Sequence, residues 1–378
     1  MNNAHIILHL SLIDGVGAAT MAMTLTSKPE SIELSDIYTM SEAQLRTSFG
    51  LTSVMASKIF AGLADTKLLA RELALIAQHN IQWATIVCPE YPASLKNIHM
   101  LPPVLYWQGI LPSDAQKAVA LVGSRKANQY GQHVIEHLIP VLVKYHYAII
   151  SGGALGADSM AHRATINAGG STVVVLGSGL LRPYPTSNRK LFSDVLVHGG
   201  AVVSAFPLET EAFAWNFPER NRIIAGLSRG SIVIQAAAKS GALITARFAL
   251  DQGRDVFAVP GPINDPLSAG CHALIAQGAK LVTSAYDVLQ EFGHIVVAPD
   301  EKAAKPQVQA KSPQQLIIQE EIDDSPQGLI LRICAVPCST DDLAVDTGLD
   351  SATLHALLFN LQLEGRVNQN FMGMWKSL

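Results

Sequence analysis

The 378-residue sequence predicts an α/β fold in its middle part, with a smaller segment on either side. Between about residues 82 and 292, eight apolar runs of strand length alternate with helical patterns. The runs are continuous and rich in Val, Ile and Ala, as expected of strands covered by helices on both faces. Glycine-rich turns follow several of them, which is typical of strand-to-helix connections. Together these observations predict a Rossmann-like domain with a parallel sheet.

Residues 1–80 are predicted to form short helices. A tight turn at Gly15, Val16 and Gly17 separates two apolar helical stretches. This pattern resembles the helix-hairpin-helix of many DNA-binding proteins, whose glycine turn offers backbone N–H groups to a phosphate. Any αα-hairpin can carry such a turn, and Lys and Arg are sparse in this segment. Structural packing is therefore the favoured role of this helix-hairpin-helix or SAM-like module, and DNA contact is the alternative.

The eight runs are assigned to strands of a domain that spans residues 81–293. In open parallel sheets, ligands bind beside the loops that follow the carboxyl ends of the strands, so those loops hold the candidate site. The expected strands lie within residues 83–88, 118–124, 147–153, 171–179, 200–206, 231–237, 255–261 and 279–284.

A change of composition marks the end of the α/β domain. Residues 294–325 are rich in Lys, Gln, Pro, Ala, Glu and Asp, which predicts a flexible linker. A winged-helix domain is predicted over residues 326–378, with three helices and a β-hairpin after Gly365. Ser339 or Thr340 is expected to cap its middle helix. The acidic side chains of that helix argue against DNA affinity, and a role in protein contacts fits equally well.

Composition excludes several classes of protein. Cys88, Cys271, Cys334 and Cys338 are too few and too scattered for a disulfide framework, which agrees with a reducing compartment. Cys334 and Cys338 lie four residues apart, but no His or second Cys pair accompanies them, so we expect small buried side chains and neither metal nor cofactor. No uncharged apolar run is long enough to span a membrane, and the first residues lack the basic segment of a signal peptide. A cytoplasmic location is therefore expected.

Charge is distributed unevenly along the chain. The formal net charge is −4, but residues 121–260 carry 13 Lys and Arg against 8 Asp and Glu, a net of +5. The remainder carries 14 against 23, a net of −9. This asymmetry predicts a basic surface on the middle domain, which would attract polyanions. An ordinary solvated face is the alternative.

The turn that follows residues 147–151 predicts a phosphate-binding site. The segment SGGALGADSMAH, residues 151–162, places glycines between the end of a strand and the start of a helix. Because Gly152 and Gly153 have no Cβ, an anion can approach main-chain N–H groups, which the helix dipole also favours. The expected ligand is therefore anionic.

Three further segments return to the same ends of the strands. VGSRKANQYG places Gly123, Ser124 and Arg125 just after a strand, where two small residues and a guanidinium can share one phosphate. Four such segments in order predict a shared anion site more strongly than any one of them. The other two segments, FPERNRIIAGLS and KSGALITA, contribute Arg220, Asn221, Arg222, Ser240, Gly241 and Thr245.

These motifs resemble those of the DNA-processing protein A family (DprA, also called Smf). The resemblance extends from about Tyr91 to Ala279, and LAVDTGLDSATLHALLFNLQLEGRV resembles the winged helix that many members append. The matching runs are YPASLKNIHMLPPVLYWQG, VGSRKANQYG, SGGALGADSMAH, the GG before TVVVLGSGL, YPTSNRKL, FPERNRIIAGLS, SGALITA, GRDVFAVPG and GCHALIAQGA.

The resemblance implies a binding protein for single-stranded DNA rather than an enzyme. Such a protein receives and protects incoming strands during natural transformation and loads the RecA recombinase onto them. A homodimer through the Rossmann-like domain is also implied. By this resemblance the DNA phosphates would be held by Gly123, Ser124, Arg125, Gly152, Gly153, Ala154, Asn188, Arg220, Asn221, Arg222, Ser240, Gly241 and Thr245.

Three positions depart from the family pattern. Ala205 stands where an acid is usual, Gln235 where a Glu is usual, and His272 where an Asn is usual. The first two departures are expected to make the pocket less acidic and to remove candidate general bases. His272 would alter recognition only if it touches a base or a phosphate.

Two enzyme classes are the alternatives. A phosphoribohydrolase of the LOG type shares the α/β scaffold, but Phe248 occupies the place of its catalytic Glu, which leaves Asp158 as the remaining candidate base. The better role for Asp158 is a first-turn acid that orders N–H groups of the loop. A dinucleotide-dependent oxidoreductase is suggested by the turn at Gly177 and Gly179, but the third glycine of that motif is absent.

Aromatic residues crowd the segment before the Arg-Asn-Arg motif. Single-strand binders without sequence preference stack bases on exposed aromatic rings, although most aromatic side chains belong to the core. We expect Phe213 and Trp215 to be the exposed stacking residues. His162, in the helix after the glycine turn, is expected to hydrogen-bond at a helix-sheet interface rather than to act as an acid or base.

Overall fold

The computed structural model describes residues 2–26, 32–295, 325–336, 338–364, 366–369 and 374–377. The chain divides into two compact units, residues 1–298 and 299–378. The linker predicted for residues 294–325 falls almost entirely outside the described residues. No helix of the described residues has the length and apolar character needed to cross a membrane.

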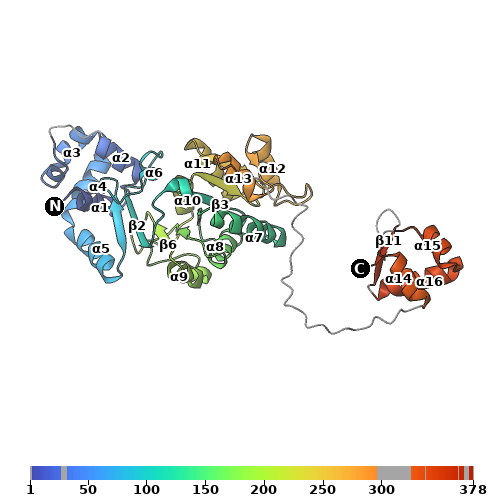
Figure 1. Cartoon of the computed structure of the whole chain (residues 1–378). Coiled ribbons are helices and arrows are strands. Elements are labelled where there is room, and N and C mark those ends of the chain that lie inside the picture. The colour runs from blue at the N-terminus through green and yellow to red at the C-terminus, as the bar shows by residue number, and fades with distance from the viewer. Residues whose placement is uncertain are drawn as a thin grey trace. The chain divides into compact units, whose positions relative to one another are not determined.

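Five helices and a 3-10 turn form the N-terminal part (Figure 1). Polar side chains begin several of them, since Asn2, Ser41 and Thr52 each accept a backbone N–H at a helix start. Gly15 has the positive φ, 82°, that the predicted tight turn requires. The elements are α1 (Asn3–Ser11), α2 (Ala18–Thr26), η1 (Leu34–Tyr38), α3 (Glu42–Phe49), α4 (Ser53–Ala64) and α5 (Thr66–Gln78).

The N-terminal helices share one hydrophobic core with the sheet. Ile6, Leu10 and Ile59 are fully buried and belong to the same cluster as Val174 and Val202 of the central strands. A buried carboxylate adds a polar link, because Glu72 on α5 accepts the backbone N–H of Leu208 at 2.9 Å. Burial raises the pKa of Glu72. The predicted helical module is therefore packed against the α/β domain and not held apart from it.

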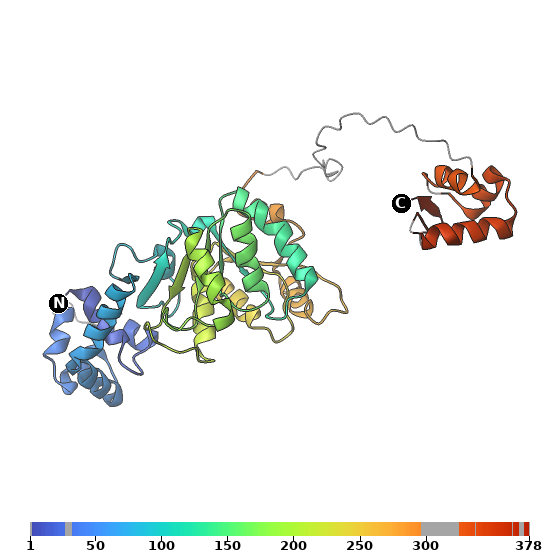
Figure 2. The same cartoon turned by 90° about the horizontal axis from the view of Figure 1, so that it is seen from below.

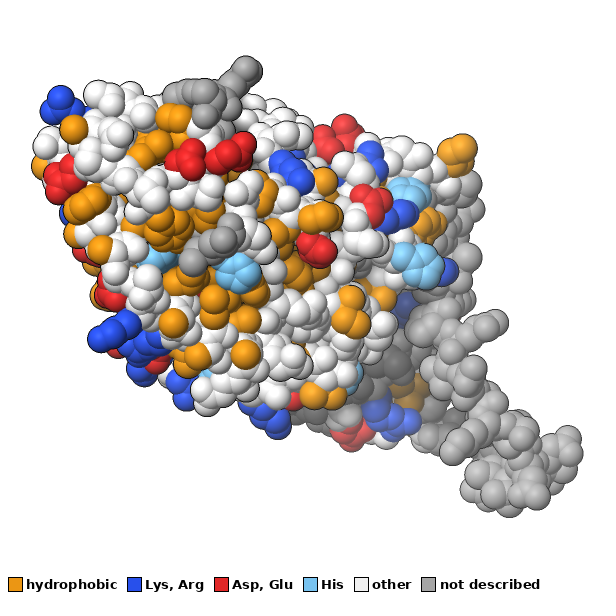
Figure 3. All heavy atoms as spheres, turned by 90° about the vertical axis from the view of Figure 1, so that its left-hand side faces the viewer, with side chains coloured by type: hydrophobic (Ala, Val, Ile, Leu, Met, Phe, Trp, Pro, Cys, Tyr) orange, Lys and Arg blue, Asp and Glu red, His pale blue; other side chains and the backbone are white. Residues whose placement is uncertain are grey.

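The outer face of these helices has mixed character. Figure 3 shows hydrophobic side chains in the middle of this face and Lys, Arg, Asp and Glu scattered around them. The described side chains on view form no continuous basic stripe, which a DNA-binding face would need. The surface therefore favours the structural role of the hairpin over DNA contact.

One nine-stranded sheet runs through the α/β domain in the order β1-β2-β6-β5-β4-β3-β7-β8-β9. The seven strands from β6 to β9 in this order are mutually parallel. Their bounds are β3 (Ala118–Val122), β4 (Ala148–Ser151), β5 (Thr172–Val175), β6 (Ala201–Ser204), β7 (Gly230–Val233), β8 (Asp255–Ala258) and β9 (Lys280–Leu281). Each predicted run overlaps one strand, which confirms the α/β class.

The predicted parallel sheet is confirmed for these seven strands, and two antiparallel pairings extend it at one edge. β1 (Gln82–Thr85) pairs antiparallel with β2 (Val104–Gly109), and β2 pairs antiparallel with β6. β2 was not among the predicted strands, because it starts directly after two prolines and combines aromatic with polar residues. A short helix, α6 (Ala93–Lys96), lies between β1 and β2 and packs Leu95 into the core.

Helices cover both faces of the sheet (Figures 1 and 2). Alternation along β3 shows the two layers: Val119 and Leu121 belong to one hydrophobic cluster, and Ala120 and Val122 to the other. The first cluster includes α7 (Gln129–Lys144), α8 (Ala157–Asn167) and α13 (Ala285–Glu291), and α9 (Arg189–Val197) packs beside α8. The second includes α10 (Asn216–Gly226), α11 (Gly241–Asp251) and α12 (Ala269–Ala276). Two short 3-10 turns are η2 (Ala115–Lys117) and η3 (Thr186–Asn188).

The C-terminal unit has the predicted winged-helix architecture. Three helices pack around Ile330, Leu343 and Leu358, and two strands pair antiparallel after them. Ser339 caps the middle helix by accepting the backbone N–H of Asp342 at 3.1 Å, as one of the two predicted caps. The elements are α14 (Pro326–Ile333), α15 (Thr340–Thr347), α16 (Ser351–Leu363), β10 (Val367–Gln369) and β11 (Trp375–Ser377).

Candidate functional site

A pocket of about 410 Å³ opens at the carboxyl ends of the parallel strands. It lies between the loops after β3 and β7, where the strand order reverses direction along the sheet. Open α/β sheets bind ligands at such a switch point, because the two diverging loops leave a crevice there. We call it the switch-point pocket. Nine predicted residues line it: Gly123, Ser124, Arg125, Ala154, Arg220, Asn221, Ser240, Gly241 and Thr245.

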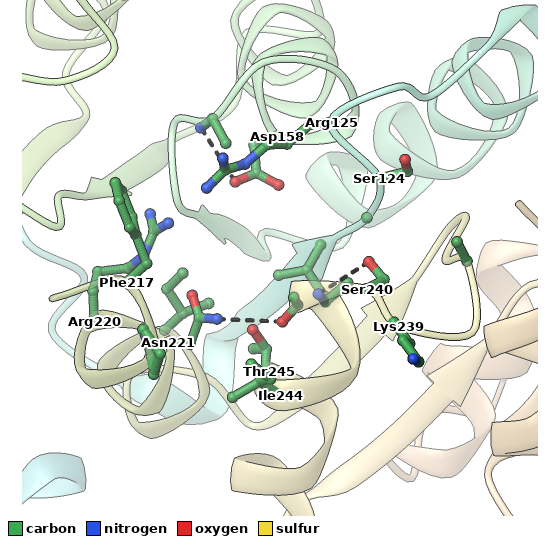
Figure 4. Close-up of a pocket in the computed structure, with 18 of the residues that line it drawn as sticks. Ser124, Arg125, Asp158, Phe217, Arg220, Asn221, Lys239, Ser240, Ile244 and Thr245 are labelled. Carbon is green, nitrogen blue, oxygen red and sulfur yellow. Dashed lines mark hydrogen bonds between the residues drawn. The ribbon is translucent and has the colours of Figure 1, made fainter. Parts of the chain in front are cut away.

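Figure 4 shows how these side chains surround the space. Phe217, Arg220 and Asn221 come from α10, whereas Ser240 and Thr245 belong to the start of α11. Asn221 Nδ2 donates to the carbonyl oxygen of Gly241 at 3.3 Å, which joins the two helices at the floor of the pocket. Ser240 Oγ accepts the N–H of Ala242 and so caps α11. The positive end of α11 therefore faces the pocket.

The loop after β3 is held firmly and presents a free cation. Ser124 N–H donates to the carbonyl oxygen of Gln235 at 2.7 Å, and Ser124 Oγ accepts the N–H of Lys126 at 3.0 Å. The exposed guanidinium of Arg125 lies 5.3 Å from the centre of the Phe217 ring. Among the described residues, no carboxylate lies within ion-pair distance of Arg125. Its charge is therefore available to a ligand.

The glycine turn after β4 has a different arrangement from the one predicted. Asp158 Oδ2 accepts the N–H groups of Gly152 at 3.2 Å and Ala154 at 3.3 Å. These are the backbone donors that were expected to hold phosphate, and a buried carboxylate of the protein already occupies them. Burial raises the pKa of Asp158, and the nearby Arg220 opposes that shift. Asp158 has the predicted role of a first-turn acid that orders the loop.

Two more predicted residues, Gly153 and Asn188, form hydrogen bonds that stabilise this turn on the side away from the pocket. Gly153 is buried, and its carbonyl oxygen accepts Nδ2 of Asn188 at 2.9 Å. The same Asn188 nitrogen approaches the carbonyl oxygen of Ala154 at 3.4 Å. Neither Gly153 nor Asn188 lines the switch-point pocket. Their geometry fits a structural role in holding the glycine turn.

The two arginines of the Arg-Asn-Arg motif point to different places. Arg220 lines the pocket, and its Nη1 donates to the carbonyl oxygens of Gly152 and Val175. Burial lowers the pKa of Arg220 to about 10, and Asp158 opposes the shift, so the guanidinium stays charged. Arg222 lies two residues further along α10, away from the pocket, and its nearest carboxylate is Glu219 at 3.6 Å. Arg222 is therefore not brought to the site.

Three pocket-lining residues with a positive charge or an aromatic ring are not among the predicted phosphate-binding residues. Lys126 and Lys239 are exposed cations without an ion-pair partner among the described residues, and Phe217 presents its ring to Arg125. Each had a signal, since the lysines adjoin Arg125 and Ser240 in the chain and Phe217 belongs to the aromatic cluster before the Arg-Asn-Arg motif. Four Lys and Arg residues thus line the pocket with one acid, Asp158. The local field favours anions.

Aromatic residues lie next to the switch-point pocket, in a neighbouring cavity and in the segment before α10. A smaller cavity shares Arg125, Phe217 and Arg220 with the switch-point pocket and is bordered by Gly152 and Tyr184. Phe213 and Trp215 stack on each other just before α10, with ring centres 4.8 Å apart and an angle of 6° between the planes. They are 42% and 68% exposed, so a flat apolar surface faces solvent.

The three family departures do not alter the pocket lining. Ala205, Gln235 and His272 all lie outside it, so the expected loss of pocket acidity is wrong. Gln235 is buried, and its amide nitrogen donates to Asn128 Oδ1 at 3.0 Å beside the start of α7. His272 bonds the carbonyl oxygen of Gly261 at 3.0 Å.

The geometry also bears on the two enzyme alternatives. Phe248, in place of a catalytic Glu, packs against the hydrophobic core. At the Gly177 to Gly179 turn, a Cβ added to Gly179 would meet backbone carbonyl oxygens of Pro207 and Leu208 at 2.2 Å. The protein's own backbone therefore fills the space beside Gly179 that a dinucleotide would need. The described residues contain no group of three His, Cys, Asp or Glu that would bind a metal ion.

Comparison with known proteins identifies the family. The model for DNA recombination-mediator protein A matches residues 82–293, more than half of the chain. The chain belongs to the DprA family. A second model, the DprA winged helix domain, matches residues 302–370. These matches cover both units of the structure.

Relatives in the DprA family come from several bacteria. The DNA processing protein DprA of Bacillus subtilis is 43% identical over 226 residues, 59% of this chain and 75% of that protein. The Smf protein of Escherichia coli is 44% identical over 205 residues, 54% of this chain and 55% of that protein. DprA of Streptococcus pneumoniae is 45% identical over 202 residues, 53% of this chain and 71% of that protein.

Two solved DprA structures resemble this one. The structure of DprA from Streptococcus pneumoniae superposes with a TM-score of 0.65 at 33% identity and covers 77% of this chain and 99% of that one. The structure of DNA processing protein A from Helicobacter pylori has a TM-score of 0.50 at 27% identity and covers 56% of this chain and 95% of that one. The latter was studied for its mode of binding single-stranded DNA.

Proposed function

We propose that this chain is a recombination mediator that binds single-stranded DNA and has no catalytic activity. The switch-point pocket carries the proposal. Arg125, Lys126, Lys239 and Arg220 line it, and its one acid, Asp158, already bonds the glycine turn. An open site with this charge attracts the phosphates of a polyanion. The single-strand binding of the Helicobacter pylori relative supports the same ligand.

The geometry supports a modified set of phosphate contacts. Side chains and the start of α11 are the donors that face the pocket, so Ser124, Arg125, Ser240 and Thr245 would hold the backbone together with Lys126 and Lys239. Gly123 and Gly241 would let the strand approach closely. Gly152, Gly153, Ala154, Asn188, Arg220, Asn221 and Arg222 would act chiefly by shaping the site, and Arg220 also by its charge. Such phosphate contacts position a strand without reading its sequence.

Phe213 and Trp215 would provide the base-stacking surface. Both rings are exposed and already parallel, so a base can stack on the outer ring while the two rings keep their arrangement. Stacking of this kind tolerates any base, because every base has a π-face. The pair directly precedes α10, whose residues Phe217 and Arg220 line the pocket. One strand can then contact both places.

The physiological role would be to protect incoming DNA during natural transformation and to load the RecA recombinase onto it. This part of the proposal rests on the family, as do a cytoplasmic location and a homodimer formed through the Rossmann-like domain. A dimer places two DNA-binding sites on one assembly. A strand bound at one site then meets the other site at a raised effective concentration. Light scattering should give twice the chain mass of 40.4 kDa at micromolar concentration. A monomer there would contradict the dimer but not the DNA site.

A nucleotide-processing enzyme of the LOG-like phosphoribohydrolase type is the second candidate. The observation in its favour is Asp158, a carboxylate with a raised pKa that lines the pocket. Its Oδ2 is committed to two backbone N–H groups, which makes it a poor general base. A nucleoside monophosphate incubated with the protein should therefore remain intact.

The decisive experiment is a fluorescence anisotropy titration of labelled single strands and of the matched duplex at two salt concentrations. We expect tight, salt-sensitive binding that prefers single strands and that mononucleotides do not displace. Weak DNA binding with strong competition by mononucleotides would overturn the proposal in favour of the nucleotide enzyme. Arg163→Ala provides the control for loss of a positive charge, since Arg163 is exposed on α8 and does not line the pocket.

A further inference from the structure

Two thiols lie side by side in the winged-helix unit. Cys334 Sγ and Cys338 Sγ are 3.8 Å apart. Cys334 ends α14, and Cys338 forms an isolated antiparallel bridge with Trp375 at the start of β11. The turn between them includes Ala335 and Val336, both exposed. The pair therefore links the end of α14 to the wing, which is the hairpin of β10 and β11, across a short surface turn.

The other two cysteines are not paired in this way. Cys88 Sγ lies 3.3 Å from the backbone nitrogen and from Oγ1 of Thr85, and Cys271 Sγ donates to the carbonyl oxygen of Val233 at 3.6 Å. Both belong to the larger unit. All four cysteines of the chain are free thiols. Cys334 and Cys338 are thus the one described pair with its sulfurs in contact.

We propose that Cys334 and Cys338 form a modification site that closes to an intramolecular disulfide in the presence of a disulfide oxidant such as oxidised glutathione. The Cys338 thiolate attacks one sulfur of the glutathione disulfide, and one glutathione thiolate leaves. Cys334 then loses its proton and attacks Cys338 Sγ, which expels the second glutathione thiolate. Two protein thiols are oxidised by two electrons, and one glutathione disulfide is reduced to two thiols.

Burial determines the order of these two attacks. Cys338 is half-buried beside the exposed turn, whereas Cys334 is fully buried. Burial and the neighbouring Cys338 sulfur raise the pKa of the Cys334 thiol, so this sulfur is a weak nucleophile toward oxidants in solution. Once Cys338 carries the glutathione, its sulfur is within reach of Cys334, and the second step becomes intramolecular.

A metal site is the competing use of the same pair. Two thiolates about 3.8 Å apart match one edge of a tetrahedral zinc site with bonds of about 2.3 Å. Zinc sites of this kind need four ligands, and the described residues offer no group of three or more. A metal would also require both sulfurs to be deprotonated, which burial of Cys334 opposes. The disulfide needs only the two sulfurs.

The bond would reinforce a junction that already exists. The carbonyl oxygen of Cys334 accepts the N–H of Ser377 at 2.8 Å, and Cys338 exchanges backbone hydrogen bonds with Trp375 at 2.8 and 3.0 Å. Both cysteines therefore hold β11 through their main chains. A disulfide would tie the end of α14 and the wing together without a change in the pairing of β11.

The test uses the full chain, reduced and then equilibrated in glutathione buffers of increasing oxidised fraction. Acid quenching, alkylation and peptide mass spectrometry report each thiol. We expect the peptide with Cys334 and Cys338 to lose two hydrogens and to lose both alkylation sites together, while Cys88 and Cys271 remain alkylated. The closure step should accelerate about tenfold per pH unit between pH 7 and 9, because only the deprotonated Cys334 attacks.

Variants separate the outcomes. Cys334→Ser should accumulate a glutathione adduct on Cys338, and Cys338→Ser should leave Cys334 unmodified. The double variant Cys88→Ser with Cys271→Ser is the control and should close as the wild type does. A stable adduct on wild-type Cys338, or full alkylation of both thiols in the most oxidising buffer, would overturn the proposal. Protection of both thiols by equimolar zinc chloride without disulfide formation would do the same in favour of a metal site.

Discussion

Asp158 and Arg220 hold Gly152 from opposite sides. The carboxylate of Asp158 accepts the Gly152 N–H at 3.2 Å, and the guanidinium of Arg220 donates to the Gly152 carbonyl oxygen. Both side chains are buried, so the two charges compensate each other in a medium of low dielectric. The glycine turn is thereby held in place beside the pocket, and the exposed positive charges that line the pocket are those of Arg125, Lys126 and Lys239.

Arg125→Ala should weaken binding to unrelated single strands by a similar factor, because a phosphate contact carries no sequence information. The slope of log affinity against log salt should fall in magnitude by about 0.7, the value for one phosphate on a single strand. Anisotropy titrations at four salt concentrations measure both quantities. Arg163→Ala should change neither. If Arg125→Ala weakens only one sequence, the guanidinium contacts a base and not a phosphate.

Trp215→Ala should cost single-strand binding about 1–3 kcal/mol, the value of one base stacked on an aromatic ring. Phe213→Ala should cost less, because its ring lies under Trp215 and is less exposed. Duplex binding should barely change, since paired bases do not present their faces. Val197→Ala, which removes an exposed apolar side chain elsewhere, is the control. Equal losses on single strands and duplex would rule out stacking at this pair.

Gly156→Ala should destabilise the larger unit and weaken DNA binding together. Gly156 has a φ of 75°, and an added Cβ would lie 2.4 Å from the carbonyl oxygen of Ser124, so the methyl group would push the Ser124–Arg125 loop outward. Gly169→Ala is a matched control, because its φ is 70° but nothing lies within 4 Å of the added Cβ. The control should lose about 1 kcal/mol from backbone strain alone and keep its DNA affinity. Urea unfolding and anisotropy measure the two effects, and identical behaviour of the variants would contradict the predicted displacement.

His162 should make the larger unit less stable in mild acid. Burial lowers its pKa to about 3 from the ordinary 6.5, so the unfolded chain binds a proton that the folded chain does not. Stability is therefore lost as the pH falls below 6.5, by about 2 kcal/mol between pH 7.5 and 5. His162→Gln should remove that part of the loss, as urea unfolding at the two pH values would report. An unchanged pH dependence in the variant would assign the acid sensitivity to other groups.

The sequence predicts the elements of this fold better than the partners of its polar groups. Continuous apolar runs indicate buried parallel strands, and glycine turns indicate which ends of the strands carry a ligand. The residues around the switch-point pocket could therefore be named in advance. β2 could not, since a strand with mixed aromatic and polar side chains that follows two prolines has no clear periodic signal.

The partners of the glycine turn could be identified only from three-dimensional structure. The N–H groups of Gly152 and Ala154 look like phosphate donors in the sequence, but Asp158 reaches back from the first turn of α8 and occupies them. Arg220 and Arg222 look equivalent in the motif, but positions two apart on a helix point in nearly opposite directions. Lys126 and Lys239 belong to two of the quoted motifs, but only the structure shows that the loops after β3 and β7 bring both lysines to the same pocket.

The N-terminal helices and the sheet share one core, so the helices cannot be removed by truncation without exposing it, and both parts are expected to unfold together on heating. A chain that began at residue 81 would lay bare the sides of Val174 and Val202 that now contact the helices, and would leave the Leu208 N–H without its carboxylate. Such a fragment would aggregate rather than report on DNA binding. Heating the intact chain should produce one calorimetric transition for residues 1–298, with no earlier step for the helices alone.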